Sequence, residues 1–191
     1  MSSSARRTRI ERGADQAPER GEIERRSAAA TELQALLVFA LGPHRFALPA
    51  ASVREIVRAV AISALPGAPE VVEGVVNYRG RIVPVADPRC RFGLDRVPLQ
   101  PDQHFVVAVA GSRWVALRVD RALELRQVLM DTVEWNPGSI APSRYVAGVA
   151  RLPDGLLVIH DLEQFLSLDE AARVDRAISA LAVSRTAGPE S

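Results

Sequence analysis

The sequence contains no lysine, so all 24 of its basic residues are arginines. Without lysine the chain can form no lysine Schiff base and cannot bind phosphate through a P-loop lysine. Its one cysteine, Cys90, excludes an intrachain disulfide and fits a reducing compartment. No run of about 18 apolar residues predicts a membrane-spanning helix. The opening MSSSARRTRIERGADQ lacks the apolar region of a secretory signal, so a cytoplasmic location is expected.

A strong net charge is also missing. The 24 basic residues face 23 acidic ones, which leaves a formal charge of +1. No overall field therefore attracts nucleic acid or an anionic membrane surface. Most of the aromatic residues alternate within apolar runs instead of interleaving with a basic face, as an RNA-binding sheet would require. Neither nucleic-acid binding nor membrane insertion is expected.

The motifs of common catalytic and metal sites are absent as well. There is no HExxH, His-x-His, CxxC, GxSxG, Walker A or GxGxxG pattern. Of the three histidines, His44 falls in a predicted turn and His104 at a predicted strand start. His160 and Asp161 are interpreted as a polar pair at the end of a strand. Two arginines flank Cys90, which favours a lowered thiol pKa, yet a semi-buried, inert thiol is the preferred interpretation. We expect no catalytic residue, no metal and no cofactor.

The chain does contain many short apolar runs separated by glycine and proline, from residue 36 to residue 160. β-Branched and aromatic residues in such runs predict strands. The run SVREIV alternates as a strand does, with Val53, Glu55 and Val57 on one face. Pairs of runs predict four hairpins, which turn at Gly42–Pro43, Arg79–Gly80, Gly111–Ser112 and Asp154–Gly155.

One helix is predicted near the C-terminal end. Ser167 and Glu170 have the spacing of a capping box. Apolar residues then recur at helical spacing and form a stripe that should pack on the strands: Ala171, Val174, Ile178 and Leu181. Residues 1–32 have few large apolar side chains and are expected to be a disordered tail, and residues 184–191 are expected to be frayed.

The ordered part repeats itself. VVEGVVNYRGRIVPVADP is similar to YVAGVARLPDGLLVIHDL, and Gly74 precedes Asp87 by thirteen positions, as Gly148 precedes Asp161. Each half shows a hairpin, a strand, a connection and a second hairpin, hence about five strands, enough for a small closed barrel without exposed edges. The sequence predicts a mainly β fold over residues 33–183, with two similar barrel subdomains that are either intertwined or in tandem.

These segments resemble the CheW-like domain of bacterial chemotaxis coupling proteins. The resemblance rests on G-V-x-N-x-R-G-x-x-V-P-V, beginning at Gly74, and on Y-x-x-G-V-A-x-L, beginning at Tyr145, and it extends over about residues 36–166. It implies two SH3-like five-stranded barrels in tandem with no catalysis of their own. It also implies a coupling role between methyl-accepting chemoreceptors and the regulatory domain of a CheA-type histidine kinase.

The resemblance further implies which residues contact the receptor. Asn77 and Arg79 match the N-x-R-G element of the docking surface, and Arg79 is interpreted as an interface residue in preference to a solvated turn residue. The strand SVREIV and the equivalent strand of the second half border the same groove, which receives the hairpin tip of the receptor coiled coil. They imply the further contact residues Val53, Glu55, Glu124 and Leu125.

Departures from the family pattern keep a second interpretation open. Tyr78 replaces the usual leucine of N-L-R-G, and Pro88 follows Asp87 where a strand residue is usual, so the strand should end at Asp87. The alternative is an adaptor of the same fold in a pilus-motility or diguanylate-cyclase pathway, or a decoy that binds receptor without kinase.

Overall fold

The computed structural model describes residues 32–135, 137–138 and 144–186, with side chains up to residue 182. The described part folds into two antiparallel-rich sheets and one α-helix. Sheet A contains, in spatial order, β8 (Arg121–Leu129), β1 (Leu33–Leu41), β2 (His44–Pro49), β11 (Gly155–His160), β10 (Val146–Leu152) and β9 (Val133–Trp135). Sheet B contains β3 (Val53–Arg58), β6 (His104–Ala110), β7 (Arg113–Val119), β5 (Arg81–Ala86) and β4 (Val72–Tyr78).

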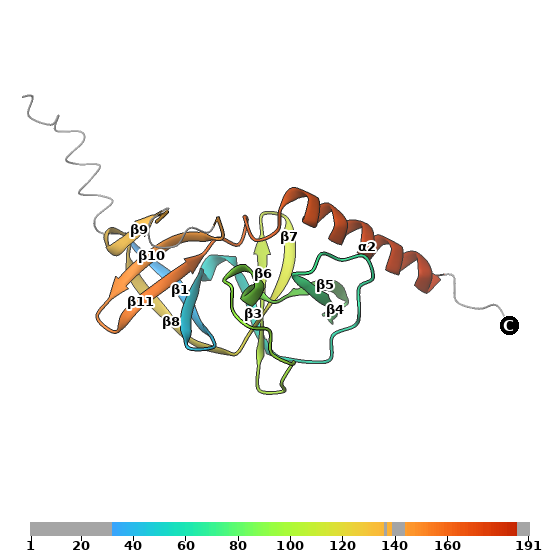
Figure 1. Ribbon diagram of the computed structural model, residues 1–191, viewed down its shortest axis with the longest axis horizontal. Coiled ribbons are helices and arrows are strands. Elements are labelled where there is room, and N and C mark those ends of the chain that lie inside the picture. Colours follow the sequence, from blue (N-terminus) through green and yellow to red (C-terminus); the bar gives the residue numbers. More distant parts are fainter. Residues whose placement is uncertain (1–31, 136, 139–143, 187–191) are drawn as a thin grey trace, which may run out of the picture.

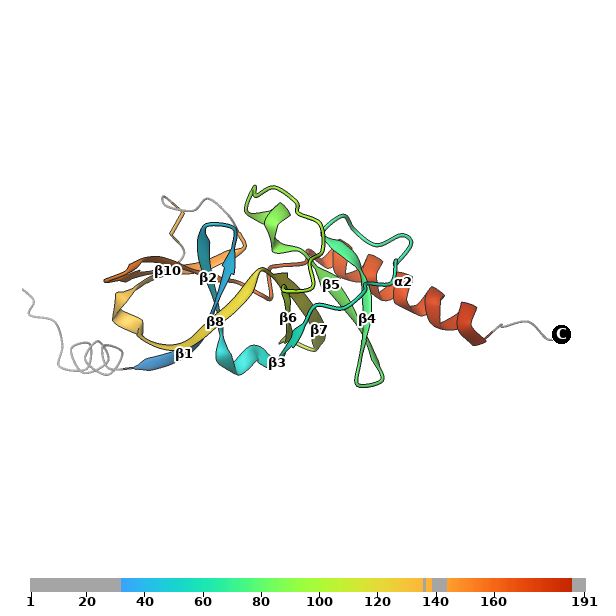
Figure 2. The ribbon, with the colours of Figure 1, turned by 90° about the horizontal axis from the view of Figure 1, so that it is seen from below.

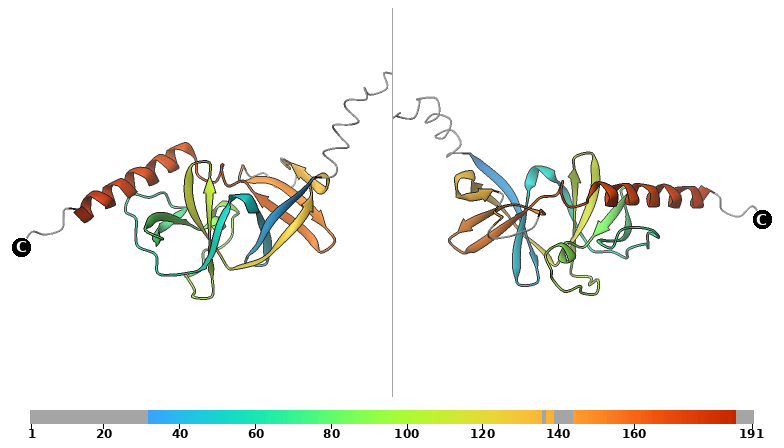
Figure 3. Two further views of the ribbon diagram at one scale, coloured as in Figure 1. Left: turned by 180° about the vertical axis from the view of Figure 1, so that it is seen from behind. Right: turned by 45° about the horizontal axis from the view of Figure 1, so that its top comes forward.

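The two sheets lie side by side along the long axis of the molecule, as Figure 1 shows. The helix α2 (Leu168–Thr186) runs along sheet B, and its C-terminal end extends past the strands (Figures 1 and 3). The tail predicted for residues 1–32 lies outside the described residues apart from Glu32, as do the last five residues of the segment 184–191.

The mainly β fold with two small barrels and a C-terminal helix is confirmed, and of the two predicted arrangements the structure has the intertwined one. Sheet A takes its hairpin β1–β2 from the first half of the chain and β8–β11 from the second. Sheet B takes β6–β7 from the second half and β3–β5 from the first. Each sheet joins its two contributions by a parallel pair, β2 with β11 and β5 with β7. The tandem barrels that the resemblance implied are therefore interleaved, and each depends on both halves.

All four predicted hairpins are present. The structure differs from the prediction in two details, the position of one turn and the number of strands in sheet A. The last one turns at Pro153–Asp154, because Gly155 is already paired with Leu152. Sheet A has six strands instead of five, because the short β9 pairs with β10. Arg79 and Gly80 both have positive φ, 49° and 82°, as the central residues of a type I′ turn do.

Three hydrophobic cores explain why the apolar runs are continuous instead of alternating. One core fills sheet A and includes Leu36 and Val38; one fills sheet B and includes Phe105 and Val107. The third core joins the sheets. It contains the side chains at the alternate positions of the same strands, such as Leu37 and Phe39. Strands β1, β2, β6 and β7 are thus buried on both faces, and a strand buried on both faces has an apolar residue at nearly every position.

The capping box at the start of α2 is confirmed. The Ser167 hydroxyl accepts a hydrogen bond from the Glu170 N–H (3.2 Å), and the Glu170 carboxylate accepts one from the Ser167 N–H (2.9 Å). Ala171 and Val174 are buried, Val174 in the joint core, whereas Ile178 and Leu181 are only half-buried. The second half of the predicted stripe is therefore partly uncovered.

The repeated glycines mark equivalent points of closure in the two barrels. Next to Gly74, Val75 forms a two-hydrogen-bond bridge with Ser63, so the connection after β3 reaches β4. Next to Gly148, β10 pairs with β9, which follows β8 through the 3₁₀ turn Met130–Thr132. At both places another segment passes so close that a side chain on the glycine would meet it.

Candidate functional site

An ion pair links the edge strand β3 to the turn between β4 and β5. The Arg79 guanidinium lies 2.8 Å from Glu55 Oε2, and the Tyr78 hydroxyl donates a hydrogen bond to the same oxygen. Burial alternates along β3 as predicted, with Val53, Glu55 and Val57 half-buried. Two of the residues implied as receptor contacts, Glu55 and Arg79, are thus in direct contact although 24 positions separate them.

Asn77 shapes the turn that presents Arg79. Its side-chain oxygen accepts a hydrogen bond from the Gly80 N–H at 2.8 Å. This bond stabilises the left-handed conformation of Arg79, which is uncommon for a residue with a side chain. The Arg79 side chain is 73% exposed, so most of it is available to a partner.

The electrostatics keep this group ionised. The hydrogen bond from Tyr78 lowers the pKa of the Glu55 carboxyl, and the charge of Arg79 lowers it further. The same hydrogen bond raises the pKa of the Tyr78 hydroxyl. At neutral pH the site therefore presents a carboxylate, an uncharged phenol and a guanidinium.

Two aromatic rings and two guanidiniums form a continuous row beside this pair, which we call the aromatic–arginine row. The Arg79 guanidinium lies 5.4 Å from the centre of the Tyr78 ring, which is 5.9 Å from that of Trp114. The Arg81 guanidinium lies 4.9 Å from the centre of the Trp114 ring, and Arg81 is paired with Tyr78 across the hairpin. The sequence prediction missed Trp114 and Arg81, because they lie on different strands, β7 and β5; the only signal was the tyrosine at position 78.

The other three implied contact residues lie elsewhere. Val53 is half-buried and packs against the joint core, so part of its side chain is structural. Glu124 and Leu125 are on β8 of sheet A, where Glu124 lies 3.6 Å from both Arg45 and Arg126. Among the described residues, no hydrogen bond or ion pair joins these two to Glu55 and Arg79.

β3 and β8 nevertheless hold equivalent positions. Each follows a hairpin of the other sheet, and each is the outermost strand of its own sheet. Both present apolar residues to solvent: β3 exposes Ile56, and β8 exposes Leu123, Leu125 and Leu129, with Leu125 72% exposed. Figure 2 shows both strands at the lower side of the molecule. The sequence prediction found only Leu125 among these exposed residues.

Cys90 is exposed as a residue, whereas its thiol makes a part-buried contact, in keeping with the semi-buried thiol predicted. Its Sγ donates a hydrogen bond to the Asp87 carbonyl oxygen at 3.2 Å. Partial desolvation raises the pKa of the thiol, and the neighbouring Arg91 offsets this only in part. The raised pKa favours the protonated thiol over the reactive thiolate at neutral pH.

His160 belongs to the core instead of forming a polar pair with Asp161. Its ring is buried between Phe92 and Phe165, with ring centres 5.3 and 5.1 Å away. Nδ1 donates to the Tyr145 carbonyl oxygen at 2.9 Å, and Nε2 has no hydrogen-bond partner among the described residues. The Asp161 carboxylate instead accepts hydrogen bonds from the next turn of backbone.

Acidification is expected to weaken the fold through His160. Burial lowers its pKa from 6.5 to about 4, so the unfolded chain takes up the proton first. The neutral ring contributes fully to the free energy of unfolding above the pKa that His160 has in the unfolded chain. This contribution is lost as the pH falls towards the lower pKa of His160 in the folded protein. Between about pH 7 and about pH 5, urea unfolding should show a loss of about 2 kcal/mol. His160→Gln should remove this pH dependence, and His44→Gln, at an exposed histidine, should leave it; an equal slope in His160→Gln would contradict the prediction.

No helix in the described part of the chain is long and apolar enough to cross a membrane. A family model for the CheW-like domain matches residues 35–170, which include every strand of both sheets except the first two residues of β1.

Individual relatives agree with this match. Chemotaxis protein CheW from Klebsiella aerogenes is 28% identical over 150 residues, which cover 78% of this chain and 90% of the relative. Protein FrzA from Myxococcus xanthus is 28% identical over 154 residues and is covered to 95%. The crystal structure of scaffolding protein TtCheW from Thermoanaerobacter tengcongensis superposes with a TM-score of 0.67 at 26% identity, over 73% of this chain and 96% of that one.

Proposed function

The chain belongs to the CheW-like domain family, and on that premise we propose that it is a non-catalytic adaptor that couples methyl-accepting chemoreceptors to a CheA-type histidine kinase. The observation that carries this proposal is the match over residues 35–170, which includes both sheets and the candidate site between β3 and the β4–β5 turn. Relatives named as chemotaxis proteins and a neighbour described as a scaffolding protein support it.

We propose that the receptor contacts the surface that carries Glu55, Asn77 and Arg79, continued by the exposed apolar residues of β3 and β8. A helical hairpin tip can pack its apolar residues on such strands, since helices bind in apolar grooves through side chains one turn apart. The exposed guanidinium of Arg79 can bind a carboxylate or a carbonyl oxygen of the partner through two parallel hydrogen bonds. Val53, Glu124 and Leu125 border this surface in the proposal.

Arg79→Glu is expected to abolish receptor binding without unfolding the protein. The change reverses the charge at the centre of the proposed contact and places the new carboxylate beside that of Glu55. The binding free energy for the receptor should therefore weaken by about 2 kcal/mol or more. Stability should change by no more than about 0.5 kcal/mol, because the side chain is mostly exposed. Isothermal titration with a receptor tip fragment and thermal unfolding measure the two quantities.

The matched control is Arg151→Glu, which changes an exposed strand arginine of sheet A whose ion pair with Glu134 is 3.5 Å long. It should bind receptor as the unaltered protein does. A loss of several kcal/mol of stability in Arg79→Glu would show that the arginine is structural, and unchanged receptor binding would remove it from the contact.

The coupling role itself is tested on the kinase side. The protein, with and without residues 1–32, is titrated calorimetrically with the regulatory domain of a CheA-type kinase from the same organism. Binding in the micromolar range is expected, and the shortened protein shows whether the tail contributes. Receptor binding without binding to any kinase of the organism would favour the decoy.

A second pathway is the alternative that the relatives favour. Protein FrzA and Protein PilI match this chain, although neither is named as a chemotaxis protein, and PilI is 30% identical over 95 residues. An adaptor of such a pathway would bind a different kinase. Titration against each CheA-type kinase of the organism in turn distinguishes the two assignments.

A further inference from the structure

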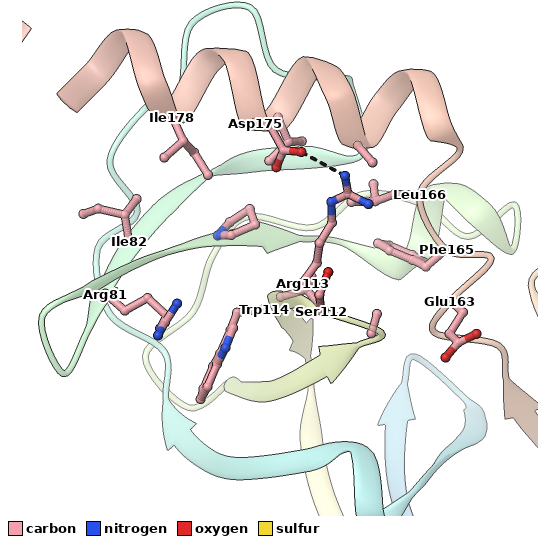
Figure 4. A pocket seen from close by; sticks show the side chains of 15 residues that line it. Arg81, Ile82, Ser112, Arg113, Trp114, Glu163, Phe165, Leu166, Asp175 and Ile178 are labelled. Atoms are coloured by element: carbon pink, nitrogen blue, oxygen red, sulfur yellow. Dashed lines mark hydrogen bonds and ion pairs between the residues drawn. The ribbon is translucent and has the colours of Figure 1, made fainter. Parts of the chain in front are cut away.

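A cavity of about 240 Å³ lies between α2 and the strands β5 and β7, and Figure 4 shows its lining. Apolar side chains form most of its wall, among them Ile82, Phe165, Val174 and Ile178. The indole of Trp114 forms one side. A space of this size, lined in this way, can hold one large apolar side chain of a partner.

The cavity continues along the helix. A second hollow of about 240 Å³ shares Ile82 and Ile178 with the first and reaches Leu181 and Ala182. It lies where the apolar stripe of α2 is only half-buried, at the end of the helix that extends past the strands. Two consecutive apolar hollows along one helix suit two apolar side chains separated by about one helical turn.

The charges at the rim differ in how they are satisfied. The Arg113 guanidinium is paired with the Asp175 carboxylate at 2.9 Å, the contact drawn in Figure 4. Arg81 has no carboxylate partner among the described residues; it lies over the face of Trp114. This leaves one guanidinium at the mouth of the cavity that can bind an acidic group of a partner.

The aromatic–arginine row connects this cavity to the candidate receptor site. Arg79 and Tyr78 stand at the Glu55 end of the row, and Trp114 and Arg81 stand at the cavity end, with no gap between successive members greater than 5.9 Å. A partner that covers Arg79 therefore next meets the exposed parts of Tyr78 and Trp114, which are partly buried against the core of sheet B, and then the cavity that Trp114 and Arg81 line. Tryptophan, tyrosine and arginine are also the residues that most often dominate binding energy at interfaces.

We propose that the receptor contact extends along this row, and that a receptor helix places an apolar side chain in the cavity beside α2 and an adjacent carboxylate on Arg81. The proposal rests on the receptor-binding function proposed above and adds the chemistry of the partner: an acidic residue next to an apolar anchor on one helical face. A partner with a basic residue at that position would face Arg81 and bind poorly.

The test compares Arg81 variants in the full-length protein, with a fluorescently labelled receptor tip fragment from the same organism as the probe. Arg81→Gln should weaken binding about tenfold and reduce its dependence on salt. The affinity of Arg81→Lys should lie between that of the unaltered protein and that of Arg81→Gln, because lysine keeps the charge but does not stack as arginine does. Arg151→Gln, at an exposed arginine of sheet A, should bind normally.

Trp114 supplies a second measurement that does not require an altered cavity. In a Trp135→Phe background it is the only tryptophan, since the sequence has two. Its emission should shift when the receptor fragment binds, because the indole leaves water. Normal receptor affinity of the Trp135→Phe protein itself would show that the background substitution leaves the fold intact.

The outcomes separate this inference from the function on which it rests. Normal affinity in Arg81→Gln and unchanged Trp114 emission, together with lost binding in Arg79→Glu, would overturn the extension and leave the receptor contact in place. No binding of the receptor fragment to the unaltered protein, with kinase binding intact, would overturn both the receptor contact and its extension.

Discussion

Replacing Arg118 with methionine is expected to lower the free energy of unfolding by about 3–5 kcal/mol. The side chain is only 2% exposed, although arginine is usually a surface residue. Its Nη2 donates to Asp87 Oδ2 (2.7 Å) and to the Val97 carbonyl oxygen (2.8 Å), and its Nε lies 3.2 Å from Glu73 Oε2. Methionine fills much of the same volume, so most of the loss should come from carboxylates that lose their counter-charge.

The network around Arg118 also connects the two sheets. Asp87 accepts two hydrogen bonds from Arg89, which in turn pairs with Asp120 at the crossing from β7 to β8. Asp120 accepts a hydrogen bond from the Gly42 N–H, in the β1–β2 turn of sheet A. Loss of Arg118 should therefore weaken the junction between the barrels, on which the relative placement of the β3 and β8 surfaces depends.

Urea unfolding of Arg118→Met gives the free energy, and Arg113→Met is the control on the same strand. The Arg113–Asp175 pair is about half-exposed, so its loss should cost less than about 1 kcal/mol. Burial already raises the pKa of Glu73 with Arg118 present. Adding Glu73→Gln to Arg118→Met should therefore recover about 1 kcal/mol or more. Equal losses in the two arginine variants would contradict a structural role for the buried network.

Local features of the fold could be predicted because their causes are local. The turn at Arg79–Gly80 and the capping box at Ser167 depend on neighbouring residues, and the structure has both. The intertwining could not be predicted, because both halves carry the same local signals. Nothing in the runs of β1 or β6 specifies whether the strand that follows each hairpin stays in its sheet or crosses to the other.

The candidate site was predictable to a similar degree. The contact between Glu55 and Arg79 follows from two motif positions that the resemblance identified, although their direct pairing required the fold. The aromatic–arginine row and the cavity beside α2 depend on side chains from β4, β5 and β7 that come together only when the barrel closes. The half-exposed end of the α2 stripe was likewise predicted as ordinary packing, because periodicity shows which face is apolar and not what covers it.

Gly74→Ala is expected to cost about 3 kcal/mol of stability or more, at one of the two points where the barrels close. A Cβ at this position would overlap the Ser63 carbonyl oxygen and lie 2.6 Å from Ile62 Cγ2. The carbonyl oxygen cannot move aside easily, because it accepts a hydrogen bond from the Val75 N–H at 2.8 Å. The methyl group must therefore break the bridge that joins the connection after β3 to β4.

Two further glycines provide a graded comparison for this prediction. At Gly148 a Cβ would meet the Val133 side chain at 2.8 Å, and a side chain can adjust more easily than backbone, so Gly148→Ala should cost less than Gly74→Ala. At Gly138 no atom lies within 4 Å, so Gly138→Ala should change stability by no more than about 0.5 kcal/mol. Urea unfolding of the three variants should give that order. A Gly74→Ala protein as stable as Gly138→Ala would mean that the close approach at Ser63 does not hold the barrel closed, and that the repeated glycine serves only the register shift between Val72 and Gly74 in β4.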